Sequence, residues 1–402
     1  MIKSIFFILV IIFPFFIPLY SAPNISSLLN RCNQFNNKTS CTVLGDIYYT
    51  ADGVTIDYDK AREFWEKACN LQEMNACYNL GILYQEGQGV TVDIKEAIEY
   101  YTIACEGEHP AACLNLGYFY QYGKGVEVDE VKARKFYIIA CKGDKANACY
   151  GLGNLYFYGK GGNTEYEKAA EAYAKACELD HDDACDNLGV MYSKGEGIAQ
   201  DYDKAQRFFT RVCDKKKVGA CYNLGILYDY GWGVEQSYPR AIELYNFACD
   251  RHHVKACYNL GILYNKGYGV SIDYPKAIGF YTKSCNRKHS PACFNLGALY
   301  FTGEGVLEDK EIASKYFAMS CALGDKESCN RSTHDNETLK RDSKDSTERR
   351  TQNKMNNEDT NDKTNTSKNK DENIEKSMNE VKNIINNIHE ENIDIDIINN
   401  FG

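Results

Sequence analysis

Apolar positions along this chain repeat every 36 residues, and residues 76–110, ACYNLGILYQEGQGVTVDIKEAIEYYTIACEGEHP, show one unit. The apolar residues of its first half share one helical face: Ala76, Leu80, Leu83 and Tyr84. Gly87 and Gly89 follow, as glycine usually does after the last turn of a helix. A second stripe begins after Asp93, the expected N-cap, and comprises Ala97, Ile98, Tyr101 and Ala104. Each unit is therefore predicted to be a helix, a Gly-x-Gly turn and a second helix.

Small residues return at two fixed positions of this unit. Glycine recurs inside the first helix, at Gly81, Gly117, Gly153, Gly189, Gly225, Gly261 and Gly297. Alanine recurs inside the second helix, at Ala61, Ala97, Ala133, Ala169, Ala205, Ala241, Ala277 and Ala313. Glycine in a helix interior costs about 1 kcal/mol relative to alanine, so its return needs a packing reason. We expect close helix–helix contact at both positions.

The cysteines follow the same period. The chain has 18 cysteines among 402 residues. Eight C-x7-C pairs run from Cys69/Cys77 to Cys321/Cys329 at 36-residue intervals, and Cys32 and Cys41 precede them with one extra residue. A fixed period of this size is typical of a solenoid of stacked supersecondary units. Eight units fit between Cys41 and Ser328, which predicts an all-α fold, an α/α solenoid.

The two ends of the chain differ from the repeats. Residues 1–22 have one lysine, an apolar run and then small residues, as a signal peptide does, and an uncleaved signal anchor is the alternative. We expect a capping helix at 23–40, no stable membrane span after signal cleavage, and a secreted or periplasmic protein, or one of the secretory pathway if the source is eukaryotic. Residues 330–402 are rich in Asn, Lys and Glu, which predicts disorder, with a weak helix at 373–390.

At this point the repeats carry a family resemblance. The pattern A-C-x-N-L-G-x-L-Y-x-x-G-x-G-V-x-x-D-x-x-K-A-x-x-x-Y-x-x-A-C resembles the Sel1-like repeat, a relative of the tetratricopeptide repeat, in its cysteine-rich form. That form is similar to the secreted Helicobacter cysteine-rich proteins, and the resemblance covers residues 41–329. It implies about eight 36-residue helix-turn-helix repeats, one disulfide per repeat, and first helices that line a concave groove.

The role of the cysteines can also be argued from their positions. The first cysteine of a pair ends a second helix and the other opens the next first helix, so a bridge would link consecutive repeats. An exported chain with an even, regularly paired count favours disulfides. Zinc is the alternative, but zinc sites commonly use C-x2-C spacing, and we expect the seven histidines to share no repeat position. We therefore predict no metal, no cofactor, and these disulfides: Cys32–Cys41, Cys69–Cys77, Cys105–Cys113, Cys141–Cys149, Cys177–Cys185, Cys213–Cys221, Cys249–Cys257, Cys285–Cys293 and Cys321–Cys329.

One polar position inside the first helix is the best candidate for ligand binding. It is occupied by Asn79, Asn115, Asn187, Asn223, Asn259 and Asn295, and by Gly151 in one unit. Asparagine is disfavoured inside helices because its side chain competes for backbone hydrogen bonds. Either these amides hold an extended peptide, as polar residues can in the resembling tetratricopeptide groove, or they bond to the backbone of the adjacent repeat and set the stacking.

Catalytic chemistry is harder to find. The Gly-x-Gly turns follow helices and not strands, which argues against a phosphate-binding loop. The Helicobacter relatives are catalogued as β-lactamases or penicillin binders, but the S-x-x-K motif occurs here as Ser367–Lys370, in the polar tail, without S-D-N or K-T-G companions. The catalytic residues thus stay unknown, and a hydrolase is suggested by resemblance alone.

Two functions remain open. The first is an exported, disulfide-linked scaffold, expected to be monomeric, whose concave face binds a protein, a peptide or a cell-wall fragment. The second is a hydrolase that acts on a β-lactam or on peptidoglycan, as the resemblance implies. The formal net charge of -10 and pI near 5.4 argue against nucleic acid as a partner. The absence of a recognisable nucleophile or metal site, together with the polar asparagine series, favours the scaffold.

Overall fold

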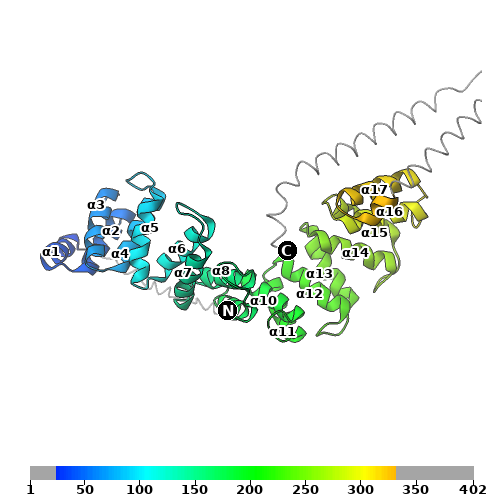
Figure 1. Ribbon diagram of the computed structural model, residues 1–402, viewed down its shortest axis with the longest axis horizontal. Helices are drawn as coiled ribbons and strands as arrows, with labels where there is room; N and C mark the ends of the chain where they lie inside the picture. The colour runs from blue at the N-terminus through cyan, green and yellow to red at the C-terminus, as the bar shows by residue number, and fades with distance from the viewer. Residues whose placement is uncertain (1–23, 332–402) are drawn as a thin grey trace, which may run out of the picture. The chain divides into compact units, whose positions relative to one another are not determined.

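The computed structural model of the protein describes residues 24–331 (Figure 1). The predicted signal peptide, most of the predicted tail and its weak helix lie outside these residues. The elements with defined bounds are all helices: α1 (Ile25–Phe35), α2 (Lys38–Thr50), α3 (Tyr58–Asn70), α4 (Met74–Glu86), α5 (Ile94–Glu106), α6 (Pro110–Tyr122), α7 (Glu130–Lys142), α8 (Ala146–Phe157), α9 (Tyr166–Glu178), α10 (Asp182–Lys194), α11 (Tyr202–Asp214), α12 (Val218–Tyr230), α13 (Tyr238–Asp250), α14 (Val254–Lys266), α15 (Tyr274–Cys285), α16 (Ser290–Thr302) and α17 (Lys310–Ala322).

The helices form two compact units with a boundary between Ala184 and Cys185, and each unit is described by itself. In both, an even-numbered first helix packs on the odd-numbered second helix that follows it, and that second helix packs on the next first helix. The predicted all-α repeat is therefore confirmed. Helix α1 occupies much of the range predicted for the N-terminal cap, and α2 begins at Lys38, inside that range. Within the described residues, no helix is long and apolar enough to span a membrane.

Helix ends lie where the sequence places them. The Asp93 carboxylate accepts hydrogen bonds from the backbone N–H groups of Lys95 and Glu96, at 3.0 and 3.1 Å, and so caps α5. Gly87 ends α4 with a left-handed φ of 71°. The second glycine of the turn, Gly89, has a positive φ as well, and a Cβ there would lie 2.5 Å from Cβ of Tyr58 in the preceding repeat. The Gly-x-Gly turn is therefore a packing requirement between repeats.

The glycine inside each first helix has the packing reason that its recurrence suggested. A Cβ added to Gly81 would lie 2.5 Å from ring carbons of Tyr101, whose side chain is fully buried against α4. The alanines of the second helix, such as Ala97, have no exposed surface. Small residues on both helices thus let each pair approach closely enough to bury an aromatic ring between them.

Disulfides cross the boundaries between repeats. Cys69 lies near the end of α3, Cys77 lies in the first turn of α4, and their Cα atoms are 4.8 Å apart. Bridges of the same kind join the predicted pairs 32–41, 105–113, 141–149, 213–221, 249–257, 285–293 and 321–329. Cys177 and Cys185 are disulfide-bonded too, and no cysteine in residues 24–331 is free. This usage indicates an oxidising environment outside the cytosol.

Candidate functional site

The asparagine series lies on the first helices, half-buried, where it contacts the preceding repeat. Asn79 Nδ2 donates to Asp46 Oδ1 at 3.0 Å, and Trp65 Nε1 donates to the same oxygen at 3.0 Å. Asp46 on α2 therefore accepts from both α3 and α4, and Asn79 links its own repeat to the preceding one. Burial raises the pKa of Asp46, although both hydrogen bonds act in the opposite direction.

In three other repeats a buried tyrosine takes the place of Trp65. Asn115 bonds to Tyr101, Asn259 bonds to Tyr245, and Asn295 bonds to Tyr281. Burial raises the pKa of each of these phenols, that of Tyr281 to about 12, so all three stay protonated and can donate. The recipients of these hydroxyl protons include Gln85 Oε1, 3.0 Å from Tyr101, and Asp229 Oδ2, 3.1 Å from Tyr245.

Repeats that lack one member of this network show how it adapts. Phe209 occupies the position of Tyr101, Tyr245 and Tyr281 and has no hydroxyl, and Asn223 Nδ2 donates to Asp186 Oδ1 instead, at 3.1 Å. Gly151 lacks the amide, and a Cβ there would lie 3.0 Å from the ring of Tyr137. Asn187 is half-buried on α10.

These contacts engage the amides of Asn79, Asn115, Asn223, Asn259 and Asn295 between repeats. They favour the stacking alternative, with the correction that the partners are side chains and not backbone groups. Ligand binding by the series stays a prediction.

Four histidines form a second series that the sequence analysis missed. His109, His181 and His253 precede α6, α10 and α14, and each Nδ1 accepts the backbone N–H three residues later, at 3.2 to 3.3 Å. Their rings lie 4.2 to 4.6 Å from the rings of Tyr78, Tyr150 and Tyr222 of the preceding repeat, and His289 lies 4.8 Å from Tyr258.

The expectation that the histidines share no repeat position is therefore wrong. His109, His181, His253 and His289 are separated by multiples of 36 residues, and an alignment of the units on this position reveals them. Their role is structural, because each supplies an N-cap acceptor or a ring at the start of a first helix.

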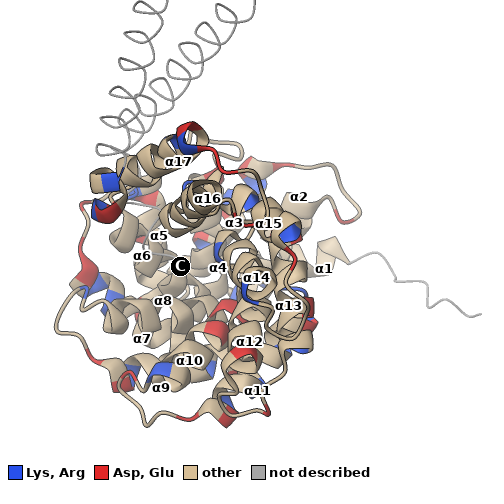
Figure 2. Cartoon of the chain, turned by 90° about the vertical axis from the view of Figure 1, so that its right-hand side faces the viewer, with Lys and Arg blue, Asp and Glu red and all other residues tan. Residues whose placement is uncertain are grey.

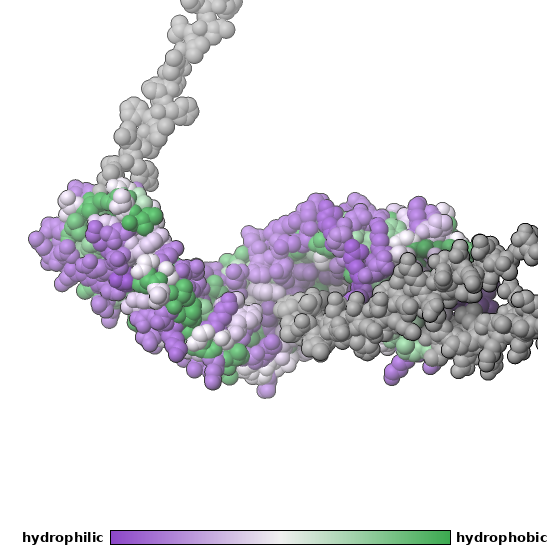
Figure 3. All heavy atoms as spheres, turned by 90° about the horizontal axis from the view of Figure 1, so that it is seen from above, coloured by the Kyte–Doolittle hydropathy of each residue, from purple (hydrophilic) through white to green (hydrophobic). Residues whose placement is uncertain are grey.

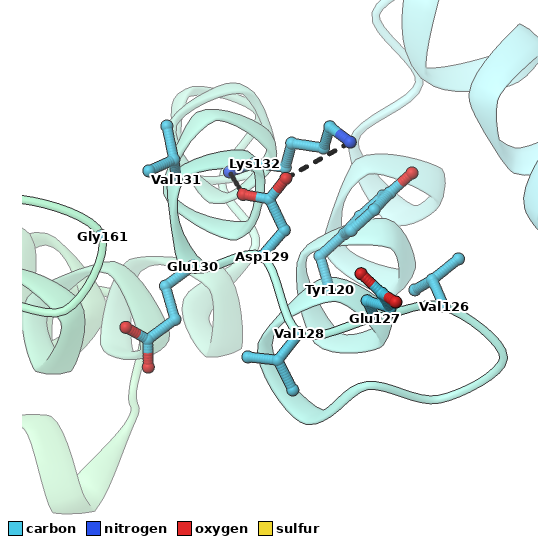
Figure 4. A pocket seen from close by; sticks show the side chains of 9 residues that line it. All are labelled: Tyr120, Val126, Glu127, Val128, Asp129, Glu130, Val131, Lys132 and Gly161. Carbon is cyan, nitrogen blue, oxygen red and sulfur yellow. Dashed lines mark hydrogen bonds and ion pairs between the residues drawn. The ribbon is translucent and has the colours of Figure 1, made fainter.

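A solvent-open depression lies in the first unit, between the turn before α7 and the turn of the next repeat. Its volume is about 610 Å³, and Tyr120, Gly161 and residues 126–132 line it (Figure 4). Asp129 caps α7 and pairs with Lys132 at 3.3 Å, while Glu130 pairs with Lys160 at 3.9 Å. The carboxylates of Asp129 and Glu130 are therefore both engaged in structural contacts.

Nothing between residues 24 and 331 assembles a metal site. No group of three or more His, Cys, Asp or Glu side chains there could hold a metal ion. The S-x-x-K motif of the tail, Ser367–Lys370, lies outside the described residues. Acidic and basic residues are interspersed over the helices and the loops, as Figure 2 shows, and hydrophobic residues are scattered among hydrophilic ones on the face in Figure 3.

Aromatic side chains are unusually exposed at the ends of three first helices. They are Tyr118 and Tyr122 on α6, Tyr158 directly after α8, and Tyr230 at the end of α12, each between 41% and 60% exposed. We call the exposed side of the even-numbered helices that carries these rings, within each unit, the first-helix face. Large exposed tyrosines are typical of protein–protein contact surfaces.

Comparison with known proteins agrees with this architecture. A chain similar to this one in structure is c5321, a protective antigen of uropathogenic Escherichia coli, at 27% identity and a TM-score of 0.63. The match covers 76% of this chain and 65% of c5321, so this chain spans less than two thirds of that protein. A Sel1 repeat protein from Oxalobacter formigenes matches at 23% identity and a TM-score of 0.58, over 76% of this chain and 88% of its own.

Helicobacter pylori cysteine rich protein B is 32% identical over 34% of this chain and 97% of its own, with a TM-score of 0.27. A search of curated protein sequences gives no match. The family model for the Sel1 repeat matches eight times, at residues 39–72, 75–109, 110–145, 146–181, 182–216, 218–253, 254–289 and 290–325. The chain belongs to the Sel1 repeat family.

Proposed function

We propose that this protein is an exported, disulfide-linked scaffold whose first-helix face binds an extended segment of a protein partner. Sel1 repeat proteins are scaffolds that generally bind protein partners. The observation that carries the proposal is the set of exposed tyrosines at the ends of the first helices, since tyrosine offers a large amphipathic contact area with few rotatable bonds.

The pair Tyr118 and Tyr122 illustrates why this surface suits binding. The two rings lie 4.6 Å apart on consecutive turns of α6, and Lys124 Nζ lies 4.7 Å from the Tyr118 ring. Each ring is supported by its neighbour, so little side-chain entropy remains to be lost on binding. The half-buried hydrogen bonds of Asn115 and Asn223 tie α6 and α12 to their preceding repeats, which helps to preorganise the surface on these two helices.

The disulfides support export. They indicate an oxidising environment, and residues 1–22 have the composition of a signal peptide, so we infer secretion or residence in the periplasm. A peptidoglycan stem peptide is an extended segment as well and could occupy the same face. No observation on the described residues favours hydrolysis of a β-lactam.

Selection of random dodecapeptides displayed on phage tests the proposal, with the oxidised full chain as bait. Selected peptides should lose about tenfold in affinity when four exposed tyrosines are replaced together: Tyr118→Ser, Tyr122→Ser, Tyr158→Ser and Tyr230→Ser. The matched control changes exposed residues of second helices instead: Lys135→Ala, Glu171→Ala and Arg207→Ala. If the peptides bind the tyrosine variant with unchanged affinity and lose affinity for the control variant, binding lies on the second helices and the proposal is refuted.

A further inference from the structure

Asp229, in the last turn of α12, carries a half-buried carboxylate without a cationic partner. Its Oδ2 accepts the hydroxyl proton of Tyr245 at 3.1 Å, and its backbone carbonyl accepts from Gln236 Nε2 at 2.7 Å. Asp229 takes part in no ion pair with any described residue. Burial raises the pKa of this carboxyl, against the effect of the Tyr245 hydrogen bond.

The negative charge is not needed to hold Tyr245. The same repeat position is occupied by Gln85, Gln121 and Asn265, whose neutral amides bond to the hydroxyls of Tyr101, Tyr137 and Tyr281. A neutral acceptor therefore satisfies the buried phenol in three other repeats of this chain. Asp229 also accepts from a buried phenol, but it does so with a charged group that burial destabilises. The hydrogen bond to Tyr245 therefore does not explain why this position carries a carboxylate.

Two further tyrosines of α12 lie near this carboxylate. Tyr230, the next residue, is 60% exposed, and its ring stacks on Trp232 with centroids 4.9 Å apart. Tyr222 lies about two helical turns before Asp229 on α12, and its ring lies 5.8 Å from that of Tyr245. Burial raises the pKa of the Tyr222 phenol to about 12, and the nearby Tyr230 and Asp229 side chains add to this rise. A carboxylate near tyrosine rings attracts an organic cation both through its own charge and through the faces of the rings.

We propose that Asp229, with the rings of Tyr222 and Tyr230, binds a lysine or arginine side chain of the protein partner. This inference rests on the proposed function of the first-helix face and names the chemistry of one anchor of the partner. The ammonium or guanidinium group of the partner forms an ion pair with Asp229, and the methylene stem of the same side chain packs on Tyr230. The formal net charge of -10 attracts a basic segment from solution.

Fluorine NMR of the full chain tests this site, because the chain has two tryptophans. With 5-fluorotryptophan incorporated, Trp232 reports on the site through its stacking on Tyr230, while Trp65, which is 2% exposed, serves as an internal control. The probes are N-acetyl-arginine methylamide and N-acetyl-lysine methylamide, and N-acetyl-citrulline methylamide is the uncharged control. We expect the two cations to shift the Trp232 signal alone, and citrulline to shift neither.

Two variants make the test specific. Asp229→Asn should fold, because Asn265 fills the same position in α14, and it should weaken cation binding about tenfold. The double change Asn265→Asp with Lys266→Tyr rebuilds the arrangement one repeat later and should add a second site for the cations. Equal shifts by arginine and citrulline, or unchanged binding in Asp229→Asn, would overturn the inference.

The peptides selected with the wild-type chain separate this inference from the proposed function. Selected peptides that contain Lys or Arg and lose about tenfold in affinity for Asp229→Asn support both. Peptides that depend on the exposed tyrosines and bind Asp229→Asn unchanged refute the cation site and leave the scaffold in place. A selection that enriches no peptide refutes the proposed function, whatever the amide probes do.

Discussion

Acid should loosen the junctions between repeats that the histidine series forms, and His253 allows the effect to be worked out. Its Nδ1 accepts the backbone N–H of Ala256 at 3.2 Å, and its ring lies 4.2 Å from that of Tyr222. Burial, and to a lesser degree the nearby charge of Lys255, lowers the pKa of this imidazole to about 4. Protonation places a hydrogen on Nδ1 that faces another N–H, so the N-cap is lost.

The sign and the size follow from linkage. The folded pKa of about 4 lies below the unfolded value of about 6.5, so the unfolded state takes up the proton first. The contribution to stability is fully present above pH 6.5 and is lost as the pH falls towards 4. For a fully shielded ring, these two pKa values give a loss of about 2 kcal/mol in the free energy of unfolding at pH 5 relative to neutral pH. The partial exposure of His253 reduces this loss to about 1 kcal/mol, the size of one N-cap.

Hydrogen exchange measured by mass spectrometry is the suitable assay, because repeat arrays open locally and a global midpoint mixes all junctions. Protection of residues 254–266, which form α14, should fall between pH 7 and pH 5 after correction for the intrinsic exchange rate, by about fivefold for 1 kcal/mol. His253→Asn is the matched control, since asparagine caps helices well and does not titrate in this range. The burial that lowers the pKa of His109 and His289 predicts the same direction at their junctions.

An equal loss of protection in His253→Asn would refute the reasoning, because the acid effect would then come from other groups. Arg287 Nη2 lies 2.7 Å from His252 Nδ1, next to the capping residue, and is the first contact to examine in that case.

Three further predictions follow from the packing and from the cysteines. Replacing Cys69 and Cys77 by serine should lower the free energy of unfolding by about 2.5 kcal/mol, measured by urea titration, since the bridge closes a nine-residue loop; an unchanged midpoint would count against the entropic argument. Gly81→Ala should destabilise by about 1–3 kcal/mol because its Cβ meets the Tyr101 ring, whereas Gly279→Ala, where a Cβ meets nothing within 4 Å, should stabilise by up to about 1 kcal/mol. The oxidised full chain should not turn over a chromogenic β-lactam; turnover that survives repurification and scales with protein would reopen the hydrolase hypothesis.

The fold could be read from the sequence because its determinants are local and repeat eight times. The N-cap at Asp93, the stop at Gly87 and the small residue at Gly81 all act within one unit, so a single register of 36 residues places them. The histidine series follows the same 36-residue period. It is harder to see because lysine occupies the position in other units, at Lys145 and Lys217.

The candidate site could not be read in the same way. Asn79 and its partner Asp46 are 33 residues apart on different helices, and nothing in either residue predicts that the two side chains meet. The significance of Asp229 depends on Tyr245, a phenol from the facing helix, and on the neutral amides that fill its position elsewhere. Such contacts are set by the packing of one helix against another, which the period alone does not specify.

The disulfides also determine how the chain can oxidise. In the bridge between Cys69 and Cys77 the partners are 8 residues apart, while the next cysteine, Cys105, lies 28 residues beyond Cys77. Loop-closure entropy alone favours the nearer pairing by about 1 kcal/mol, or about sixfold, before any helix has packed. A chain that crosses a membrane from its N-terminus can therefore form each bridge as soon as its second cysteine emerges, and pairing errors are disfavoured from the first repeat to the last.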